Sequence, residues 1–259
     1  IRSCLVGSEM CIRDRSFIDH LEELRWHIIR VTLAVVAAAL IAFLGKSLLF
    51  DILIFGPTKP DFFTYDLLCK ASSLLGFDSF CDTNFQFEIQ SRTMAGQFSA
   101  HIWTSITFGF VIAFPYALYE FWKFISPGLY SNERKNSRGF IFISSLLFFL
   151  GVLFGYFVVC PLSINFLGTY SVASQVHNDF DLNSYIALVR ASVLASGLIF
   201  ELPIIIYYLT KVGLVTPEFL KRNRKYALVI VLIISAIITP PDVASQIIVA
   251  IPVIILYQV

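Results

Sequence analysis

Residues 139–160 form a run of twenty-two residues without one charged side chain. At a rise of ~1.5 Å per residue, a helix of this length is roughly 33 Å long, which matches the hydrocarbon core of a bilayer at about 30 Å. Buried helices of soluble domains are seldom both so long and so apolar. The run therefore predicts a helix that spans a membrane.

The rest of the chain has the same character. Of its 259 residues, 57% are apolar and 14% are charged, whereas a soluble domain carries about 25% charged residues. Apolar runs alternate with short segments that hold most of the charges, which is typical of a helical bundle in lipid. We expect an all-α, polytopic membrane protein with about six spans. The expected helices cover approximately residues 20–50, 102–122, 139–160, 185–210, 226–239 and 243–259.

Separate predictions concern the last two helices and the first fifteen residues. Residues 226–239 would form a helix of roughly 21 Å at ~1.5 Å per residue, so the last two helices are either re-entrant or lie in a thinned bilayer. No charged or polar segment follows the apolar run of residues 243–259, so we expect this sixth span to be truncated. Residues 1–15 lack the apolar region of a signal peptide and are expected to be a non-native leader, which leaves residues 16–259 as a single membrane domain.

Lys and Arg predict the orientation, because positive charges in short loops resist export. They gather before the first helix, between the second and third, and between the fourth and fifth, whereas residues 161–185 hold none. We therefore expect a cytoplasmic amino terminus.

Two charged residues, Arg190 and Glu201, lie within the predicted fourth helix. A charge at the position of Glu201 costs ~2.5–3.5 kcal/mol on insertion scales, so this carboxyl group either contacts a passing substrate or is a hydrogen-bonded group that fixes helix packing. Arg190 lies about 16 Å away along the helix at ~1.5 Å per residue. It cannot pair directly with Glu201 and is expected to extend toward the outer headgroups.

The first outer loop contains two cysteines, Cys69 and Cys81, with eleven residues between them. If the loop faces an oxidising compartment, a disulfide can persist there. The alternative, two buried thiols, stays open.

Five motifs follow one another along the chain: HLEELR, FPYALYEFWKFISPGLYSNERK, GYFVVCPLSINFL, FELP and ITPPDVASQIIVAIP. Taken alone, the charged clusters in the first two are typical of solvated helix ends and loops. Together, and in this order over residues 16–259, they resemble the TatC family, whose members are core subunits of twin-arginine protein translocases.

The resemblance implies a function. Proteins of this kind recognise Arg-Arg signal peptides of folded cargo proteins in the bacterial inner membrane and nucleate their export, driven by the proton-motive force. It also implies a concave bundle, small single-span TatA/TatB-type partner subunits and self-association, with no cofactor and no nucleic acid. No GxxxxGK[ST] loop for ATP is present.

The resemblance also implies site residues. Glu23 and Glu133 match the positions that bind the twin arginines, and a guanidinium fits a carboxylate in a bidentate way that lysine cannot reproduce. Other matches of the same receptor are Arg25, Phe124, Pro127, Leu129 and Arg134. Residues outside the receptor match other family positions. Glu201 matches an intramembrane acid, and Pro57 and Asp242 match outer-loop positions. Thr239 and Gln246 match a polar cluster that docks partner helices.

The chain departs from the family pattern in two places. Residues 58–97 form a longer outer loop than the shortest members have, which predicts an additional amphipathic or disulfide-tied cap. Glu120 lies beside the receptor loop, where it either adds negative charge to the site or pairs with Lys123.

Two other classes of function were weighed. A secondary transporter would also explain an intramembrane glutamate, but no repeated halves are evident. For an enzyme, the chain lacks HExxH and GxSxG motifs, and His20, His27, His101 and His177 are scattered. We expect neither catalysis nor a metal site.

Overall fold

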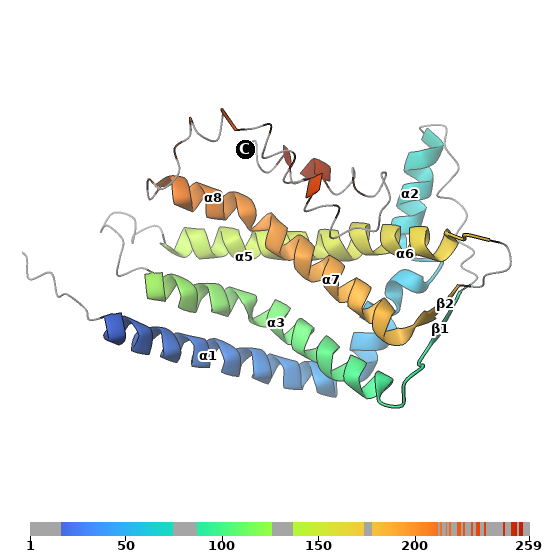
Figure 1. Cartoon of the computed structure of the whole chain (residues 1–259), viewed down its shortest axis with the longest axis horizontal. Helices are drawn as coiled ribbons and strands as arrows, with labels where there is room; N and C mark the ends of the chain where they lie inside the picture. The colour runs from blue at the N-terminus through green and yellow to red at the C-terminus, as the bar shows by residue number, and fades with distance from the viewer. Residues whose placement is uncertain are drawn as a thin grey trace, which may run out of the picture.

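The computed structural model describes residues 17–74, 87–125, 137–173 and 178–211, and beyond 211 only scattered residues and runs of two or three. Within these ranges, four helices are long and apolar enough to cross a membrane: Leu21–Leu44, Gly96–Ile125, Gly139–Thr169 and Leu182–Lys211. They lie side by side along the long axis of the molecule (Figure 1). The expected all-α membrane fold is confirmed, while the predicted fifth and sixth spans lie almost wholly outside the described residues.

The first long helix packs along the second. Helix α1 (Phe17–Leu44) is followed by a π-helical segment, η1 (Leu48–Ile54), and a short 3-10 turn, η2 (Gly56–Thr58). The second helix, α3 (Gly96–Ile125), begins six residues before its predicted start and carries Pro115 in its interior. Where the helices touch, a Cβ added to Gly109 would lie 2.6 Å from the backbone nitrogen of Ala39. Only glycine permits so close an approach of the two backbones.

The third span runs further than its predicted end at Cys160. It consists of α5 (Ser137–Phe154), a π-helical turn, η4 (Gly155–Val159), and α6 (Cys160–Thr169), without a break between them. Pro161 lies in the first turn of α6, a position where the missing N–H costs little and the fixed φ suits a helix. The proline therefore continues this span instead of ending it.

The fourth span is divided in two. Helix α7 (Leu182–Phe200) and helix α8 (Leu202–Lys211) meet at Glu201, which caps α7. Helix α7 lies against α5 and η4 so closely that a Cβ on Gly155 would lie 2.6 Å from the carbonyl oxygen of Ser192. Small residues at such contacts allow helices to pack where lipid gives no hydrophobic drive.

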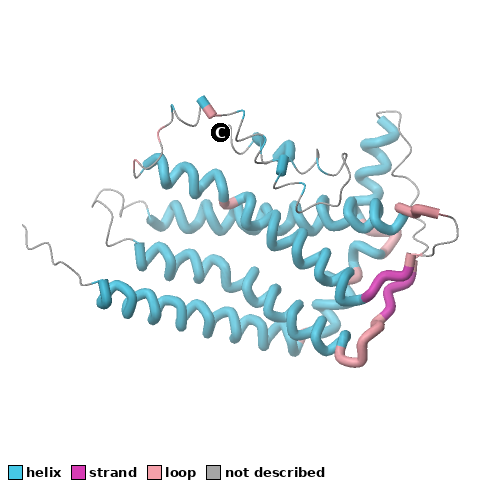
Figure 2. The backbone as a smooth tube through the Cα atoms, in the orientation of Figure 1, coloured by secondary structure: helices cyan, strands magenta, loops and turns pink. Residues whose placement is uncertain are grey.

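One end of the bundle carries additional structure (Figure 2). Helix α2 (Phe63–Leu74) stands at a steep angle to the long helices, and strand β1 (Glu88–Gln90) pairs in parallel with β2 (Asp179–Asp181), Glu88 opposite Asp179. The strand pair was not predicted. Helix α2 lies within the longer outer loop, where the additional cap was expected.

The α2 cap is tied to the bundle. Tyr65 donates a hydrogen bond to the carbonyl oxygen of Pro57 at 2.7 Å, and Thr64 donates to that of Phe157 at 2.6 Å. Burial raises the pKa of the Tyr65 hydroxyl, which stays a donor there. Cys69 is disulfide-bonded; its predicted partner Cys81 lies outside the described residues, so the pairing stays a prediction.

Candidate functional site

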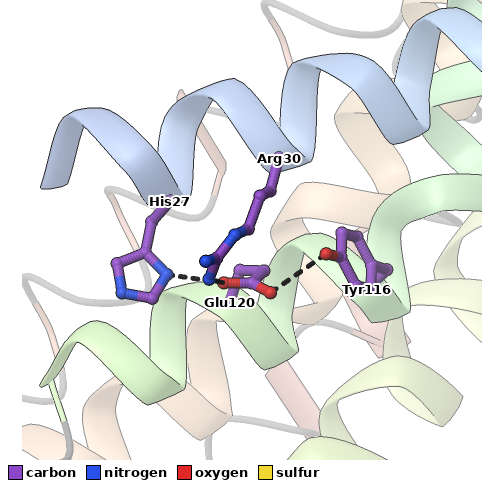
Figure 3. A network of polar contacts seen from close by, with 4 residues as sticks. All are labelled: His27, Arg30, Tyr116 and Glu120. Carbon is purple, nitrogen blue, oxygen red and sulfur yellow. Dashed lines mark hydrogen bonds and ion pairs between the residues drawn. The ribbon is translucent and has the colours of Figure 1, made fainter. Parts of the chain in front are cut away.

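A network of polar side chains joins α1 to α3 (Figure 3). The ring nitrogen Nδ1 of His27 lies 2.5 Å from Oε2 of Glu120, and Tyr116 donates a hydrogen bond to Oε1 at 3.0 Å. Arg30 approaches Oε2 with Nη1 at 3.8 Å. His27 and Glu120 are only 7% and 3% exposed. Each carboxylate oxygen of Glu120 therefore has a donor, as a buried acid requires.

Local helix geometry explains this arrangement. His27 and Arg30 are three residues apart on α1, and Tyr116 and Glu120 are four apart on α3, so each pair lies on one helix face. The packing of α1 against α3 then brings the two faces together. The network joins residues 93 positions apart in the sequence.

A pocket of about 330 Å³ opens beside this network. Its walls come from α1 and α3 and are mainly apolar, with Leu24, Ile28, Phe121 and Phe124 among them; the Glu120 carboxylate is part of the wall. An apolar pocket with few polar groups is the usual form of a ligand site. Here it can accept an apolar side chain next to a buried acid.

Two predicted receptor residues lie close to this pocket. Glu23 is half-buried and precedes His27 by one helical turn, and the ring of Phe124 lies 6.0 Å from the His27 ring in an edge-on contact. Arg25 is exposed. The remaining predicted receptor residues, Pro127, Leu129, Glu133 and Arg134, lie outside the described residues.

Glu201 lies in a second polar contact, between α5 and the α7–α8 junction. Its side chain is 5% exposed, and its Oε2 accepts a hydrogen bond from the hydroxyl of Ser144. Within the described part of the chain, Oε1 is buried without a partner. One side of this carboxyl group is therefore unsatisfied.

Comparison with known proteins identifies the family. The family model for the Sec-independent protein translocase protein TatC matches residues 19–252. This chain belongs to the TatC family. TatC of Blattabacterium sp. subsp. Periplaneta americana (strain BPLAN) is 46% identical to it over 244 residues, which cover 93% of this chain and 92% of that protein. TatC of Aquifex aeolicus (strain VF5) is 35% identical, over 93% of this chain and 91% of its own.

Two solved structures show the same fold. A crystal structure of the twin arginine translocase receptor TatC superposes with a TM-score of 0.67 at 36% identity, over 92% of this chain and 95% of that one. A crystal structure of the same receptor in DDM gives a TM-score of 0.70 at 35% identity, over 92% and 96%. As a TatC protein, the chain is a multi-pass membrane protein and a subunit of the Sec-independent protein translocase. The resemblance drawn from the sequence motifs is thereby confirmed.

The other residues matched to TatC positions have varied surroundings. Pro57 is fully buried beneath α2, and the side-chain amide of Gln246 donates to the carbonyl oxygen of Leu232 at 3.1 Å. Asp242 and Thr239 lie outside the described residues. The roles implied for all four stay predictions.

Arg190 lines a pocket between helices. Its Nε is buried without a hydrogen-bond partner in the described part of the chain. Its extension toward the outer headgroups stays a prediction.

Sequence reasoning missed the partnership of His27 with Glu120. His27 was considered only as one of four scattered histidines, and Glu120 was expected to add charge to the receptor or to pair with Lys123. The available signal was a histidine and an acid, each within an apolar helix and each costly without a partner. Ser144 was also missed as the donor to Glu201. A serine within an uncharged run does not indicate by its sequence context which residue it bonds to.

Proposed function

We propose that this chain is the signal-peptide receptor of its translocase and that it binds the arginine pair at the predicted cytoplasmic end of α1 and α3. The observation that supports this proposal is the convergence of two motif segments at one apolar pocket. The turn of α1 that carries Glu23 and His27 lies beside the turn of α3 that carries Glu120 and Phe124. The segment with Glu133 follows directly after α3.

The chemistry of this region suits a guanidinium pair. Glu23 is half-buried, so a charged contact there is less screened than in bulk water. Two separate glutamates, Glu23 and Glu133, would each accept a bidentate fork from one arginine, which an ammonium group cannot match. Arg25 and Arg134 would orient the acids, while Phe124, Pro127 and Leu129 would contact the peptide backbone and apolar side chains.

Further parts of the proposal concern the path beyond the receptor. The apolar segment of the signal peptide would enter the bundle and reach Glu201 after its arginines are held. Partner subunits with one span would dock near Thr239 and Gln246, with Asp242 and Pro57 shaping the outer loops, and copies of the chain would associate in the inner membrane. Cargo would be folded proteins, driven across by the proton-motive force.

The decisive experiment measures binding of an Arg-Arg signal peptide and its Lys-Lys counterpart to the purified chain in nanodiscs. Wild-type protein should prefer the Arg-Arg peptide by about tenfold or more, as expected for charge-assisted bidentate pairs. Glu23→Ala combined with Glu133→Ala should abolish that preference. Glu22→Ala is the matched control, because Glu22 is exposed on the neighbouring position of α1.

Two results would contradict the proposal. Equal binding of both peptides by the wild type would show that the protein does not recognise the arginines. If the double variant still prefers the Arg-Arg peptide, residues other than Glu23 and Glu133 recognise the arginines. The first of these results would give weight to solute transport, which uptake into liposomes would test.

A further inference from the structure

A large pocket, of about 540 Å³, lies where α1 has ended and where α3 and α7 begin. Its lining includes Lys46 and Asp51, which follow α1, His101 in the second turn of α3, and Leu182, the first residue of α7. These three helices are candidate membrane spans, and the three ends lie at the same end of the bundle. The pocket therefore lies at one boundary of the hydrocarbon region, the outer boundary in the predicted orientation.

The lining of this pocket combines aromatic residues with charged ones. Phe50, Phe55 and Phe98 supply rings, while Lys46 and Asp51 supply charges of opposite sign. Ligand sites in proteins commonly have this composition, in which apolar and aromatic surface surrounds a few polar groups that orient the ligand.

Lys46 and Asp51 are unpaired among the described residues. Neither the ammonium group of Lys46 nor the carboxylate of Asp51 forms an ion pair there. Lys59 approaches Asp51 but donates to its backbone carbonyl oxygen, at 3.2 Å. A single ion would be attracted by one of the two charges and repelled by the other, whereas a group that carries both signs can satisfy both. The pocket thus suits a zwitterion.

Part of the pocket wall is held in place by contacts of its own. Nε2 of His101 donates a hydrogen bond to the carbonyl oxygen of Phe43 at 3.1 Å. The His101 ring stacks on that of Phe43, with centroids 4.0 Å apart, and the Phe50 ring meets it edge-on at 5.4 Å. A wall that is fixed before binding reduces the entropy lost when a ligand is ordered.

The position and size of the pocket select the occupant. A volume of about 540 Å³ is within the range of about 300–1,000 Å³ for small-molecule sites. Phe98 is 64% exposed, so the aromatic wall continues to the surface of the bundle at the boundary of the bilayer. Zwitterionic phospholipids carry a phosphate and an ammonium group at this depth, with acyl chains on the apolar side.

We propose that the pocket binds the head group of a zwitterionic phospholipid with a primary ammonium group, as in phosphatidylethanolamine. Lys46 pairs with the phosphate. The carboxylate of Asp51 accepts hydrogen bonds from the ammonium group, which also meets the aromatic wall. The site is separate from the proposed receptor, because His101 and Glu120 lie nineteen residues apart on α3, about 28 Å at ~1.5 Å per residue.

The test is native mass spectrometry of the purified full chain, titrated with phosphatidylethanolamine, phosphatidylcholine or phosphatidylglycerol of the same acyl chains. Wild-type protein should retain one phosphatidylethanolamine about tenfold more tightly than phosphatidylcholine, whose quaternary ammonium has no N–H to donate. Phosphatidylglycerol has no cationic group and should also be retained about tenfold more weakly. Soluble phosphoethanolamine, the same head group without acyl chains, should not displace the lipid; displacement would overturn the assignment to a lipid.

Substitutions in the pocket test the two charges separately. Asp51→Ala should remove the preference for phosphatidylethanolamine over phosphatidylcholine, and Asp51→Glu should keep most of it. Lys46→Gln should weaken retention of both zwitterionic lipids by about tenfold. Asp66→Ala and Lys70→Gln are the matched controls and should change neither value, because both residues are exposed on α2 and lie outside the pocket lining.

Both pocket charges are on exposed residues, so the substitutions of Lys46 and Asp51 should leave the chain folded. Equal retention of the three lipids by the wild type would overturn the proposal. A preference for phosphatidylethanolamine over phosphatidylcholine that persists in Asp51→Ala would also overturn it.

Discussion

Glu120 and Glu201 are both glutamates buried in the membrane-spanning helices, at 3% and 5% exposure, but their surroundings differ. Both carboxylate oxygens of Glu120 have partners, from His27, Arg30 and Tyr116. Glu201 has the Ser144 hydroxyl on one oxygen and, within the described part of the chain, nothing on the other.

The difference indicates different roles. A fully satisfied acid between two helices fixes their packing, and any change of partner would cost its existing bonds. A half-satisfied acid at a helix junction retains an acceptor for another donor. Burial alone therefore does not distinguish the two glutamates; the number of hydrogen-bond partners does.

The largest expected effect comes from Glu120→Leu. His27 would lose its partner in a buried position, and we expect the free energy of unfolding to fall by about 3 kcal/mol, the lower end of the range for a broken buried pair. Denaturant unfolding in detergent measures this change. A loss no greater than that of the exposed control Glu22→Ala would show that the network does not hold α1 to α3.

A double substitution tests whether the loss comes from the unpaired buried histidine. His27→Leu together with Glu120→Leu removes both polar groups and leaves apolar side chains in their place, so it should be less destabilising than Glu120→Leu alone. The same unfolding assay reports the difference. A double variant that is less stable than the single one would mean that the leucines do not pack in this space.

Ser144→Ala should have an intermediate effect of about 2 kcal/mol, because it leaves the second oxygen of a buried carboxyl group without a donor. Glu201→Gln can still accept from Ser144 through its amide oxygen and should cost less. Unfolding of both variants, measured side by side, tests whether Ser144 is the group that holds Glu201. A larger loss in Glu201→Gln than in Ser144→Ala would contradict the assignment.

Tyr116→Phe should cost about 1 kcal/mol, the usual value for one hydrogen bond. Tyr116 is 39% exposed, so its loss leaves Oε1 of Glu120 partly accessible to another donor. Thermal unfolding of this variant, compared with Glu120→Leu, ranks the partners. If the two variants lose equal stability, Tyr116 is the main partner and His27 is secondary.

The smallest effect concerns a carboxylate outside the membrane-spanning segments. Asp181 caps α7 and accepts from the backbone nitrogens of Arg92 and Asn183 at 3.3 and 3.0 Å. These bonds, that from Arg92 first, lower the pKa of Asp181. A lowered folded-state pKa means that the stabilisation is present above the unfolded-state value of about 3.9 and is lost as the pH falls through the folded-state value.

Asp181→Asn should therefore flatten the decline in stability between neutral pH and about pH 3. The measurement is the unfolding midpoint of wild-type and variant protein over this range. Parallel declines in the two proteins would assign the acid sensitivity to other carboxylates.

The fold class was predictable from the sequence because bilayer thickness sets a length that uncharged runs must meet, as residues 139–160 do. The family was predictable because its motifs are contiguous in sequence. Helix α2 was foreseen only as an additional cap in a long loop. The strands β1 and β2 were not foreseen, because three-residue strands carry no periodic pattern and pair only when the ends of α3 and α7 meet.

For the candidate site, the sequence alone determined that Glu201 and Arg190 stand out as charged residues within an apolar helix. The partners of the buried acids were decided by tertiary structure, because Glu120 meets His27 across 93 positions and Glu201 meets Ser144 across 57. Helix periodicity tells which residues share a face, but the rotation of one helix against another depends on close contacts such as Gly109 with Ala39 and Gly155 with Ser192.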